Sequence, residues 1–303
     1  MKLRDLHILL AASQAGSMSK AAVSLGVSQP AVWKAIADLE RTVGAQLLER
    51  SRQGVVPTAH GLALLKCSVA VFDELRRGVK ELEFLSDPTT GELRIGCTEP
   101  LAAGFVAMVI DRLSQHYPKA TFHAVSADRS ALMDRDLRQR DIEVAVMATE
   151  GVDLAADADA EFLFDDRHVV VAGPQSKWSR RRKVALSDLI AEPWVLPPPD
   201  SIAGSSLADA FRARGLEPPS ARVVTFSVPL HCHLLATGRF LTMLPLSMAH
   251  FGKHLPLKLL RVEPPPNRRP IGIVTLKNRT LSPLARLFID IARDVAKPLA
   301  KLG

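Results

Sequence analysis

The stretch MSKAAVSLGVSQPAVWKAIADLE, residues 18–40, decides the fold of the first part of the chain. It opens with a short helical segment in which the small side chains of Ala21 and Ala22 let a second helix approach closely. Gly26 follows and permits the left-handed backbone of a tight turn. The stretch therefore predicts two short helices joined by a turn.

The second helix of this pair has a well-marked start. Ser28 is a favourable N-cap residue, and Pro30 stands in the first turn, where its missing N–H leaves no hydrogen bond unmade. The residues at spacings of four and three, predicted to be buried, are Val32, Ile36 and Leu39. The other faces are left to Gln29, Trp33, Lys34 and Ala37. This pattern is typical of a helix-turn-helix whose second helix can enter a major groove of DNA.

A basic hairpin is predicted next, in LERSRQGVVPT, residues 48–58. Gly54 marks its turn, and we expect Arg52 to lie against phosphates or in the adjacent minor groove. The alternative is a helical hairpin that only packs, followed by a solvated basic loop. The cap, the proline, the basic hairpin and a long helix occur in order, and together they favour DNA binding.

One long helix is predicted over residues 58–86. No proline interrupts it, and apolar residues recur at spacings of three and four, which indicates one continuous apolar seam. The seam consists of Leu62, Leu65, Val69, Phe72, Leu75, Val79, Leu82 and Leu85. Residues 87–91, Asp-Pro-Thr-Thr-Gly, end the helix and predict a hinge.

From residue 92 onward, short strand-like runs alternate with helical ones, which predicts parallel sheets built from βαβ units and arranged as two α/β lobes. The runs are 93–96, 103–116, 122–126, 130–140, 143–148, 168–172, 205–215, 222–226, 229–237, 240–244, 271–276 and 282–296. The predicted organisation is a winged helix-turn-helix in 1–60, the helix 58–86, the hinge 87–91 and a two-lobed α/β domain in 92–303. Lobe I takes about 92–162 and 268–303, and lobe II about 163–267.

Composition limits the class of protein. The 303 residues are 47% hydrophobic and 23% charged, which is ordinary for a chain that folds around a core. The net charge of +7 is compatible with a polyanionic partner, whereas a single Tyr disfavours a platform for stacking single-stranded bases. Three scattered cysteines predict a reduced, cytoplasmic protein, and the chain shows neither a signal peptide nor an apolar run long enough to span a membrane.

The sequence resembles the LysR-type transcriptional regulators. The resemblance lies in Ser17-x2-Lys20-Ala21-Ala22-x2-Leu25-x-Val27-Ser28-Gln29-Pro30-Ala31, then Ile36-x2-Leu39-Glu40-x3-Gly44-x2-Leu47-Leu48-x-Arg50, and finally Thr58-x2-Gly61. A weaker similarity extends from Glu92 to Leu302, over the family's two-lobed domain, which resembles periplasmic binding proteins.

The resemblance implies a homodimer joined through the 58–86 helix, often assembled to a homotetramer, which controls transcription in response to a small molecule. Its partners would be double-stranded DNA, this effector and itself, with RNA polymerase as a further candidate and no membrane. The DNA contacts that it implies are Ser28, Gln29, Pro30, Trp33, Lys34, Arg50, Arg52 and Gln53. Members often have a small polar residue where Trp33 stands and Arg where Lys34 and Gln53 stand. We therefore do not expect this protein to recognise the same DNA sequence as better-known members of the family.

The effector site is expected in the cleft between the lobes, at the carboxyl ends of strands and near helix N-termini. The candidates are Thr98, Glu99, Pro100, Ser126, Ala127, Thr149, Ser201, Phe226 and Ser227. For each Ser or Thr, the alternative is a helix cap without a ligand role. Free helix N-termini slightly favour a carboxylate, while Glu99 and Asp128 argue against a multiply charged one.

Other chemistry has weaker signals. Residues 231–233, His-Cys-His, resemble a metal site, but adjacent residues on a helix point to different faces, so we expect no metal and no cofactor. Cys97 lacks a nearby resolving partner for redox chemistry, and the basic run 180–183 is interpreted as a solvated loop. A transporter's solute-binding protein and an enzyme on the same scaffold are the competing hypotheses. The first hypothesis is disfavoured because we read no signal peptide in the sequence. The second is disfavoured because the sequence shows no nucleophile–base pair, so we expect no catalytic residue.

Overall fold

The computed structural model describes residues 1–303 except 52–53, 152–153, 155–156, 253–254, 263–267 and 302–303, and only the backbone of residues 50 and 268. The chain forms two compact units, Met1–Val79 and Lys80–Gly303. The boundary falls inside the long helix α4, Ala59–Ser86. Each unit has its own hydrophobic core, and each is described by itself.

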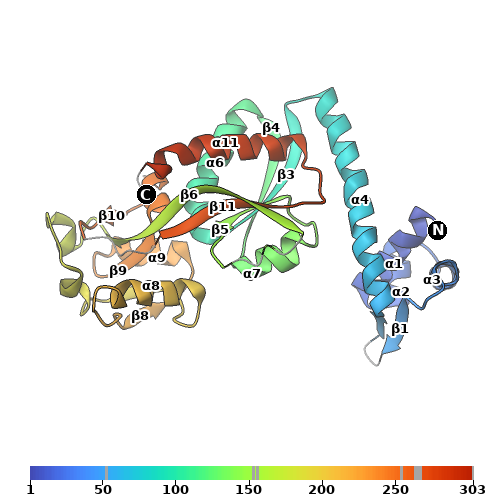
Figure 1. Ribbon diagram of the computed structural model, residues 1–303, viewed down its shortest axis with the longest axis horizontal. Helices are drawn as coiled ribbons and strands as arrows, with labels where there is room; N and C mark the ends of the chain where they lie inside the picture. The colour runs from blue at the N-terminus through green and yellow to red at the C-terminus, as the bar shows by residue number, and fades with distance from the viewer. Residues whose placement is uncertain (52–53, 152–153, 155–156, 253–254, 263–267, 302–303) are drawn as a thin grey trace. The chain divides into compact units, whose positions relative to one another are not determined.

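The first unit is the predicted helix-turn-helix with its hairpin (Figure 1). Helices α1 (Leu3–Ala15), α2 (Met18–Leu25) and α3 (Gln29–Val43) are followed by the antiparallel strands β1 (Leu48–Ser51) and β2 (Gly54–Pro57). Each helix ends at a glycine with positive φ, at Gly16, Gly26 and Gly44. The apolar face predicted for the second helix is confirmed, since Val32, Ile36 and Leu39 are buried.

Helix α4 confirms the predicted long helix, but its apolar seam is divided. Leu65 and Phe72 pack against the core of the first unit, and the Phe72 ring centroid lies 5.6 Å from that of His7. The exposed members of the seam are Leu62, Leu75, Val79, Leu82 and Leu85. Leu75 to Leu85 repeat at spacings of four, three and three, and they form an exposed apolar row along the second half of the helix.

The second unit is built on one nine-stranded sheet in the order β4-β3-β5-β11-β6-β9-β7-β8, with β10 paired to β6. The strands are β3 (Thr90–Cys97), β4 (Lys119–Ser126), β5 (Val144–Ala148), β6 (Ala158–Ala172), β7 (Trp194–Leu196), β8 (Ala221–Val224), β9 (Leu241–Pro245), β10 (Lys258–Leu259) and β11 (Arg268–Leu276). The expectation of parallel sheets is wrong for the middle of this sheet. Strand β11 runs antiparallel to both β5 and β6, and β6 runs antiparallel to β9, whereas β3 pairs in parallel with β4 and β5.

Long crossing strands account for this difference. The first part of β6 pairs with β11 in lobe I, and its last five residues, His168–Ala172, pair with β9 in lobe II. The sequence indicated only the apolar end of β6, because five of the first ten residues of the strand, ADAEFLFDDR, are charged. Strands β7 and β10 were not predicted at all, and strand β3 already begins at Thr90, inside the predicted hinge.

Helices cover both faces of the sheet (Figure 1). They are α5 (Glu99–Leu101), the π-helical turn η1 (Ala102–Val106), α6 (Ala107–His116), α7 (Arg129–Ala131), the π-helical turn η2 (Leu132–Leu137), α8 (Ile202–Arg212), α9 (Val228–Ala236), α10 (Leu246–Phe251) and α11 (Pro283–Ala300), with 3-10 turns η3 (Lys177–Arg180) and η4 (Leu186–Leu189). Central strand β5 is buried at every position, because alternate side chains meet η2 on one face and the α6–α11 layer on the other. This packing holds the carboxyl ends of β3 and β5 in fixed positions.

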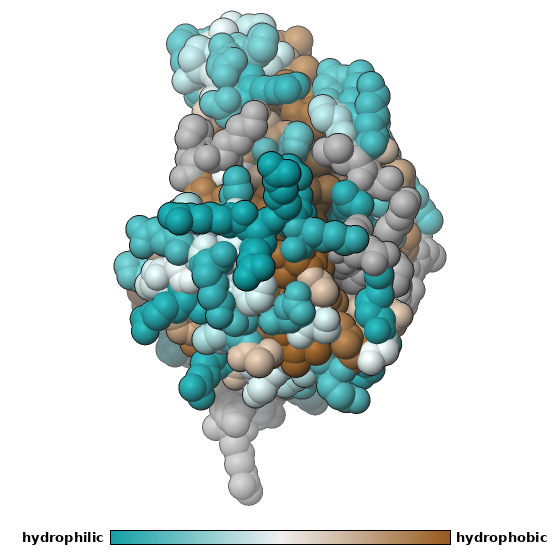
Figure 2. Space-filling view, turned by 90° about the vertical axis from the view of Figure 1, so that its left-hand side faces the viewer, coloured by the Kyte–Doolittle hydropathy of each residue, from teal (hydrophilic) through white to brown (hydrophobic). Residues whose placement is uncertain are grey.

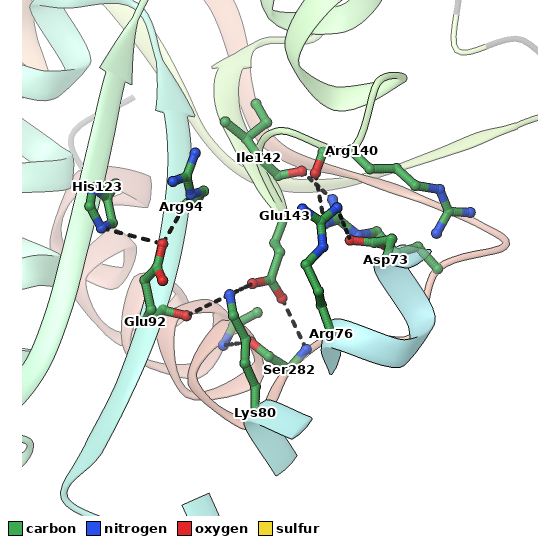
Figure 3. A network of polar contacts seen from close by, with 12 residues as sticks. Asp73, Arg76, Lys80, Glu92, Arg94, His123, Arg140, Ile142, Glu143 and Ser282 are labelled. Carbon is green, nitrogen blue, oxygen red and sulfur yellow. Dashed lines mark hydrogen bonds and ion pairs between the residues drawn. The ribbon is translucent and has the colours of Figure 1, made fainter. Parts of the chain in front are cut away.

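A buried carboxylate joins several elements of lobe I. Glu143 accepts a hydrogen bond from the backbone N–H of Ser282 (3.1 Å), at the start of α11, and pairs with Lys80 at 3.7 Å (Figure 3). Lys80 also donates to the backbone oxygen of Glu92, while the Glu92 carboxylate accepts from Arg94 and lies 3.3 Å from His123. The end of α4 is thereby tied to β3, β5 and α11.

Lobe II has its own core around Trp194, whose indole N–H donates to the backbone oxygen of Leu189 and whose ring meets Phe211 edge to face. Figure 2 looks at the lobe II end of this unit and shows hydrophilic side chains over most of the face, with apolar side chains gathered between them. The basic residues 180–183 are exposed, as expected for a solvated loop. Within the described part of the chain, none of the helices combines the length and apolar character that a bilayer span needs.

Candidate functional site

The start of α3 is built by capping. The hydroxyl of Ser28 accepts a hydrogen bond from the backbone N–H of Ala31 (3.4 Å), and Pro30 occupies the first turn. Helix α2 is capped in the same way by Ser17. These caps fix where α3 begins, and they leave its first residues at the surface.

The exposed side of α3 carries the residues predicted to contact DNA. Ser28, Gln29, Pro30 and Lys34 are exposed. Trp33 is half-buried and packs partly against the core of the first unit. The structure thus places the predicted residues together at the start of one helix, an element that a major groove admits.

The base of the β1–β2 hairpin is held by three residues of the motif. Glu40 accepts hydrogen bonds from the backbone N–H groups of Leu47 (2.8 Å) and Leu48 (3.3 Å). Thr58 accepts from the N–H of Gly61 (3.0 Å) and donates to the backbone oxygen of residue 46 (2.6 Å). A Cβ on Gly61 would lie 2.0 Å from the Leu47 oxygen, so only glycine fits there. These residues set the position of the hairpin relative to α3.

The hairpin residues predicted to contact DNA are only partly described. Arg50 lies in β1, and only its backbone is described. Arg52 and Gln53 lie outside the described residues. Their roles stay predictions.

A cavity of about 470 Å³ lies between the lobes of the second unit. Residues from both lobes line it, at the ends of β3, β4 and β9, in the middle of β6 and at the starts of α5, α8 and α9. Its size is that of sites for small molecules. The lining residues predicted from sequence are Thr98, Glu99, Pro100, Ser126, Ala127, Ser201 and Phe226.

Two predicted residues do not line the cavity. The hydroxyl of Thr149 donates to the backbone oxygen of Pro270 (3.2 Å), which turns it toward β11. The hydroxyl of Ser227 accepts from the N–H of Leu230 and caps α9. Ser201 does both, since it lines the cavity and caps α8 through the N–H of Gly204 (3.0 Å).

The sequence prediction missed the charged residues that the crossing strands bring to the cavity. Arg167 and His168 come from β6, and Arg269 comes from β11, whose register pairs it with Asp166. Arg129, next to the predicted Ser126 and Ala127, also lines the cavity. A charged run inside β6, at 165–168, and the Arg-Arg pair that opens β11 were the available signals.

Burial shapes the electrostatics of these groups. Burial lowers the pKa of Arg269, and the neighbouring charge of Arg129 lowers it further. Burial also lowers the pKa of Arg129. Burial, with a smaller effect of Arg269, lowers the pKa of His168 to about 3, so its ring is neutral at physiological pH. Burial raises the pKa of Asp166, against two hydrogen bonds from Ser247 (3.1 and 2.5 Å).

One hydrogen bond crosses the cavity. The Glu99 carboxylate, at the start of α5, accepts from the N–H of Val228 (2.9 Å), at the start of α9 in the other lobe. His231 follows one turn later, and burial lowers its pKa. The carboxylate thus occupies the N-terminus of α9, a place that favours negative charge.

The other chemical candidates find no support in the described residues. The described residues contain no group of three or more His, Cys, Asp or Glu side chains that could hold a metal ion. Cys97 is fully buried, and burial raises the pKa of its thiol to about 11, which keeps it protonated.

Two family models match this chain. The model described as "LysR substrate binding domain" matches residues 86–297, and the one described as "Bacterial regulatory helix-turn-helix protein, lysR family" matches residues 3–62. The chain belongs to the LysR family. It is a LysR-type DNA-binding transcriptional regulator with an effector-binding domain.

Curated relatives match the LysR chain over nearly its whole length. The HTH-type transcriptional regulator GbpR of Azospirillum brasilense is 28% identical over 97% of this chain and 86% of its own. The uncharacterized HTH-type transcriptional regulator YdcI of Escherichia coli strain K12 is 27% identical over 97% of this chain and 95% of its own.

Solved structures share the fold of this LysR chain. CbnR, a LysR family transcriptional regulator, aligns with a TM-score of 0.64 and 21% identity over 98% of this chain and 99% of its own. A full-length OxyR variant from Pseudomonas aeruginosa aligns with a TM-score of 0.65 and 18% identity over 99% of this chain and 96% of its own. Full-length CbnR complexed with its target DNA aligns with a TM-score of 0.56 and 21% identity over 98% of this chain and all of its own.

Proposed function

We propose that this LysR-type regulator binds DNA as a dimer through α3 and the hairpin, and that a small molecule in the inter-lobe cavity controls its activity. The observation that carries the DNA-binding role is the exposed start of α3, with Gln29 and Lys34 beside a capped N-terminus. Gln can bond adenine, and Lys can bond guanine or a phosphate. The existence of a CbnR complex with its target DNA supports this role.

The same proposal assigns the DNA contacts. They are Ser28, Gln29, Pro30, Trp33 and Lys34 on α3, and Arg50, Arg52 and Gln53 on the hairpin. Since the Ser28 hydroxyl already accepts a hydrogen bond from Ala31, it would act toward DNA as a donor. Trp33 would add apolar contact with a thymine methyl group or a sugar.

Dimerisation is assigned to α4. Its exposed row from Leu75 to Leu85 includes Leu82 and Leu85, whose relative exposures are 65% and 73%. An apolar row of this kind on a helix is typical of a helix–helix interface. We propose a homodimer through this row, assembled further to a homotetramer, with RNA polymerase as a further partner, in the cytoplasm.

Effector control is assigned to the cavity, which collects residues of both lobes. A molecule bound there contacts both lobes, so its affinity would differ between arrangements of the lobes and it would favour one of them. An effector acts only through such a difference in affinity between two states of the protein. The regulator role, with no catalytic role, accords with the relatives, which are transcriptional regulators.

The test is DNA binding by the purified full-length protein across a salt series. Lys34→Ala and Arg52→Ala should weaken binding, and each should reduce the slope of log K against log salt by about two in a dimer, because about 0.9 is lost per phosphate contact. Lys258→Ala, which changes an exposed lysine of β10, is the matched control and should leave the slope unchanged. Unchanged affinity and slope in both test variants would overturn the assignment of α3 and the hairpin.

A further inference from the structure

The cavity has a cationic side made by the two crossing strands and the start of α7. Arg269 on β11 and Arg129 on α7 lie close enough for the charge of Arg129 to lower the pKa of Arg269. Arg129 also donates to the backbone oxygen of Glu150 (2.5 Å), which fixes its guanidinium. His168 adjoins Arg269, whose charge lowers the histidine's pKa. The charges of Glu150 and Asp166 act on the pKa of Arg269 in the opposite direction.

Polar atoms on this side are buried without partners. They are Nε of Arg129, Nε of Arg167 and Nδ1 of His168, and each lacks a hydrogen bond within the described part of the chain. His168 is only 6% exposed, and it lines the cavity. Unsatisfied buried polar atoms are costly, so a bound group that accepts hydrogen bonds is the natural complement.

Each carboxylate of the cavity already accepts at least one hydrogen bond from the chain. Asp166 accepts twice from Ser247, Glu99 accepts from the N–H of Val228, and Asp128 accepts from the N–H of Ala131. The cavity-lining groups with a buried polar atom that lacks a partner, within the described part of the chain, are Arg129, Arg167 and the neutral His168. Among the described lining residues, the three arginines face three carboxylates, so the formal charges balance and one further negative charge matches the remaining donors better than two.

Much of the rest of the cavity is apolar. Aliphatic and aromatic side chains from both lobes line it, namely Leu101, Ile202, Leu207, Phe226, Met243 and Ile271. Ile202 and Phe226 are more than half exposed, which places uncovered apolar surface at the cavity. A body of carbon atoms would bury this surface at a gain of about 25 cal/mol per Å².

We propose that the effector is a monocarboxylate with an apolar body, whose carboxylate binds Arg129, Arg269 and His168. The guanidinium groups donate to the carboxylate, and His168 donates through Nδ1 in its neutral form. The apolar body extends toward Ile202 and Phe226. This inference rests on the proposed function, in which the cavity is the effector site.

The test is calorimetric titration of the full-length protein with matched probes. They are 3-phenylpropionate and octanoate, the corresponding amides, and the dicarboxylate phenylsuccinate. Each monocarboxylate should bind roughly ten- to a hundredfold more tightly than its amide, because charge-assisted hydrogen bonds contribute about 1.5–3 kcal/mol. Equal affinity for acid and amide, or no binding by either monocarboxylate, would overturn the proposal, as would tightest binding of the dicarboxylate.

Variants locate the site. Arg269→Gln and Arg129→Gln should each remove most of the preference for acid over amide, while retained amide binding shows that the cavity is still formed. Arg222→Gln, an exposed arginine on β8, is the matched control and should keep the preference. Unchanged preference in both test variants would place the anion elsewhere and overturn the proposal. If Arg269→Gln fails to fold, Arg129→Gln decides.

Glu99 supplies an independent readout. Glu99→Gln removes one negative charge from the cavity and keeps a side chain that accepts from Val228. It should raise the affinity for phenylsuccinate about tenfold, and an unchanged affinity would contradict the charge balance on which the proposal rests. These titrations contain no DNA. Tight monocarboxylate binding that leaves DNA binding unaltered would therefore support the assignment of a monocarboxylate site in the cavity, and it would count against the cavity's role as effector site.

Discussion

Replacing Glu40 by alanine should loosen the hairpin while leaving the helices of the first unit formed. The carboxylate of Glu40 accepts from the N–H groups of Leu47 (2.8 Å) and Leu48 (3.3 Å), and these two residues are 0% and 6% exposed. No water reaches the Leu47 N–H as the chain is folded, so the substitution leaves a buried donor unsatisfied.

The magnitude follows from these contacts. A hydrogen bond to a charged acceptor contributes about 1.5–3 kcal/mol, and the shorter bond has the better geometry, so we expect a loss of about 2 kcal/mol. That energy corresponds to roughly a thirtyfold fall in protection against local opening. Glu40→Gln keeps a neutral acceptor and should lose about half as much free energy.

Hydrogen exchange of the full-length protein, followed by mass spectrometry, measures this effect in peptides that cover β1 and β2. Glu49→Ala is the matched control, because Glu49 is an exposed glutamate on β1 of the same hairpin. Glu40→Ala should exchange faster in these peptides and bind DNA more weakly. Exchange rates equal to those of Glu49→Ala would refute the view that Glu40 supports the hairpin.

Two further outcomes are expected. Leu82→Glu should dissociate the dimer, because it places a charge in the apolar row of α4. The fold should be unharmed, since Leu82 is 65% exposed. Light scattering after gel filtration would then show a monomer, and an unchanged dimer would argue against this interface. Because burial lowers the pKa of His168 to about 3, the unfolded chain binds more protons than the folded one between about pH 3 and 6.5, and the free energy of unfolding should fall by about 2 kcal/mol from pH 7.5 to 5. His168→Gln should remove this part of the pH dependence in urea unfolding followed by tryptophan fluorescence, and an equal slope in both proteins would contradict it.

The helix-turn-helix could be predicted from sequence because its determinants are local. Ser28, Pro30 and Gly44 act on the helix that contains or adjoins them, and the apolar spacing of Val32, Ile36 and Leu39 reports its own buried face. The structure adds the reason for two motif positions: Gly61 allows the close approach of Leu47, and Glu40 satisfies the N–H groups at the hairpin base.

The cavity could be predicted only in part. Strand ends followed by helix starts indicated residues such as Thr98, Ser126 and Ser201, since this signal is contained in short stretches. Arg167 and Arg269 escaped because they are about a hundred residues apart and meet only through the antiparallel pairing of β6 with β11. Spacing along the chain carries no information on that register, and β11 itself was expected to belong to a parallel sheet.

Selection of genomic DNA fragments by the purified full-length protein tests the central claim most directly, with each enriched fragment then titrated across a salt series beside the Lys34→Ala variant. The account predicts enrichment of a site with two related half-sites on one face of the duplex, bound in a salt-dependent manner and bound more weakly by the variant. Enrichment of no sequence, or equal binding by the variant, would contradict the assignment of α3 as the element that reads DNA.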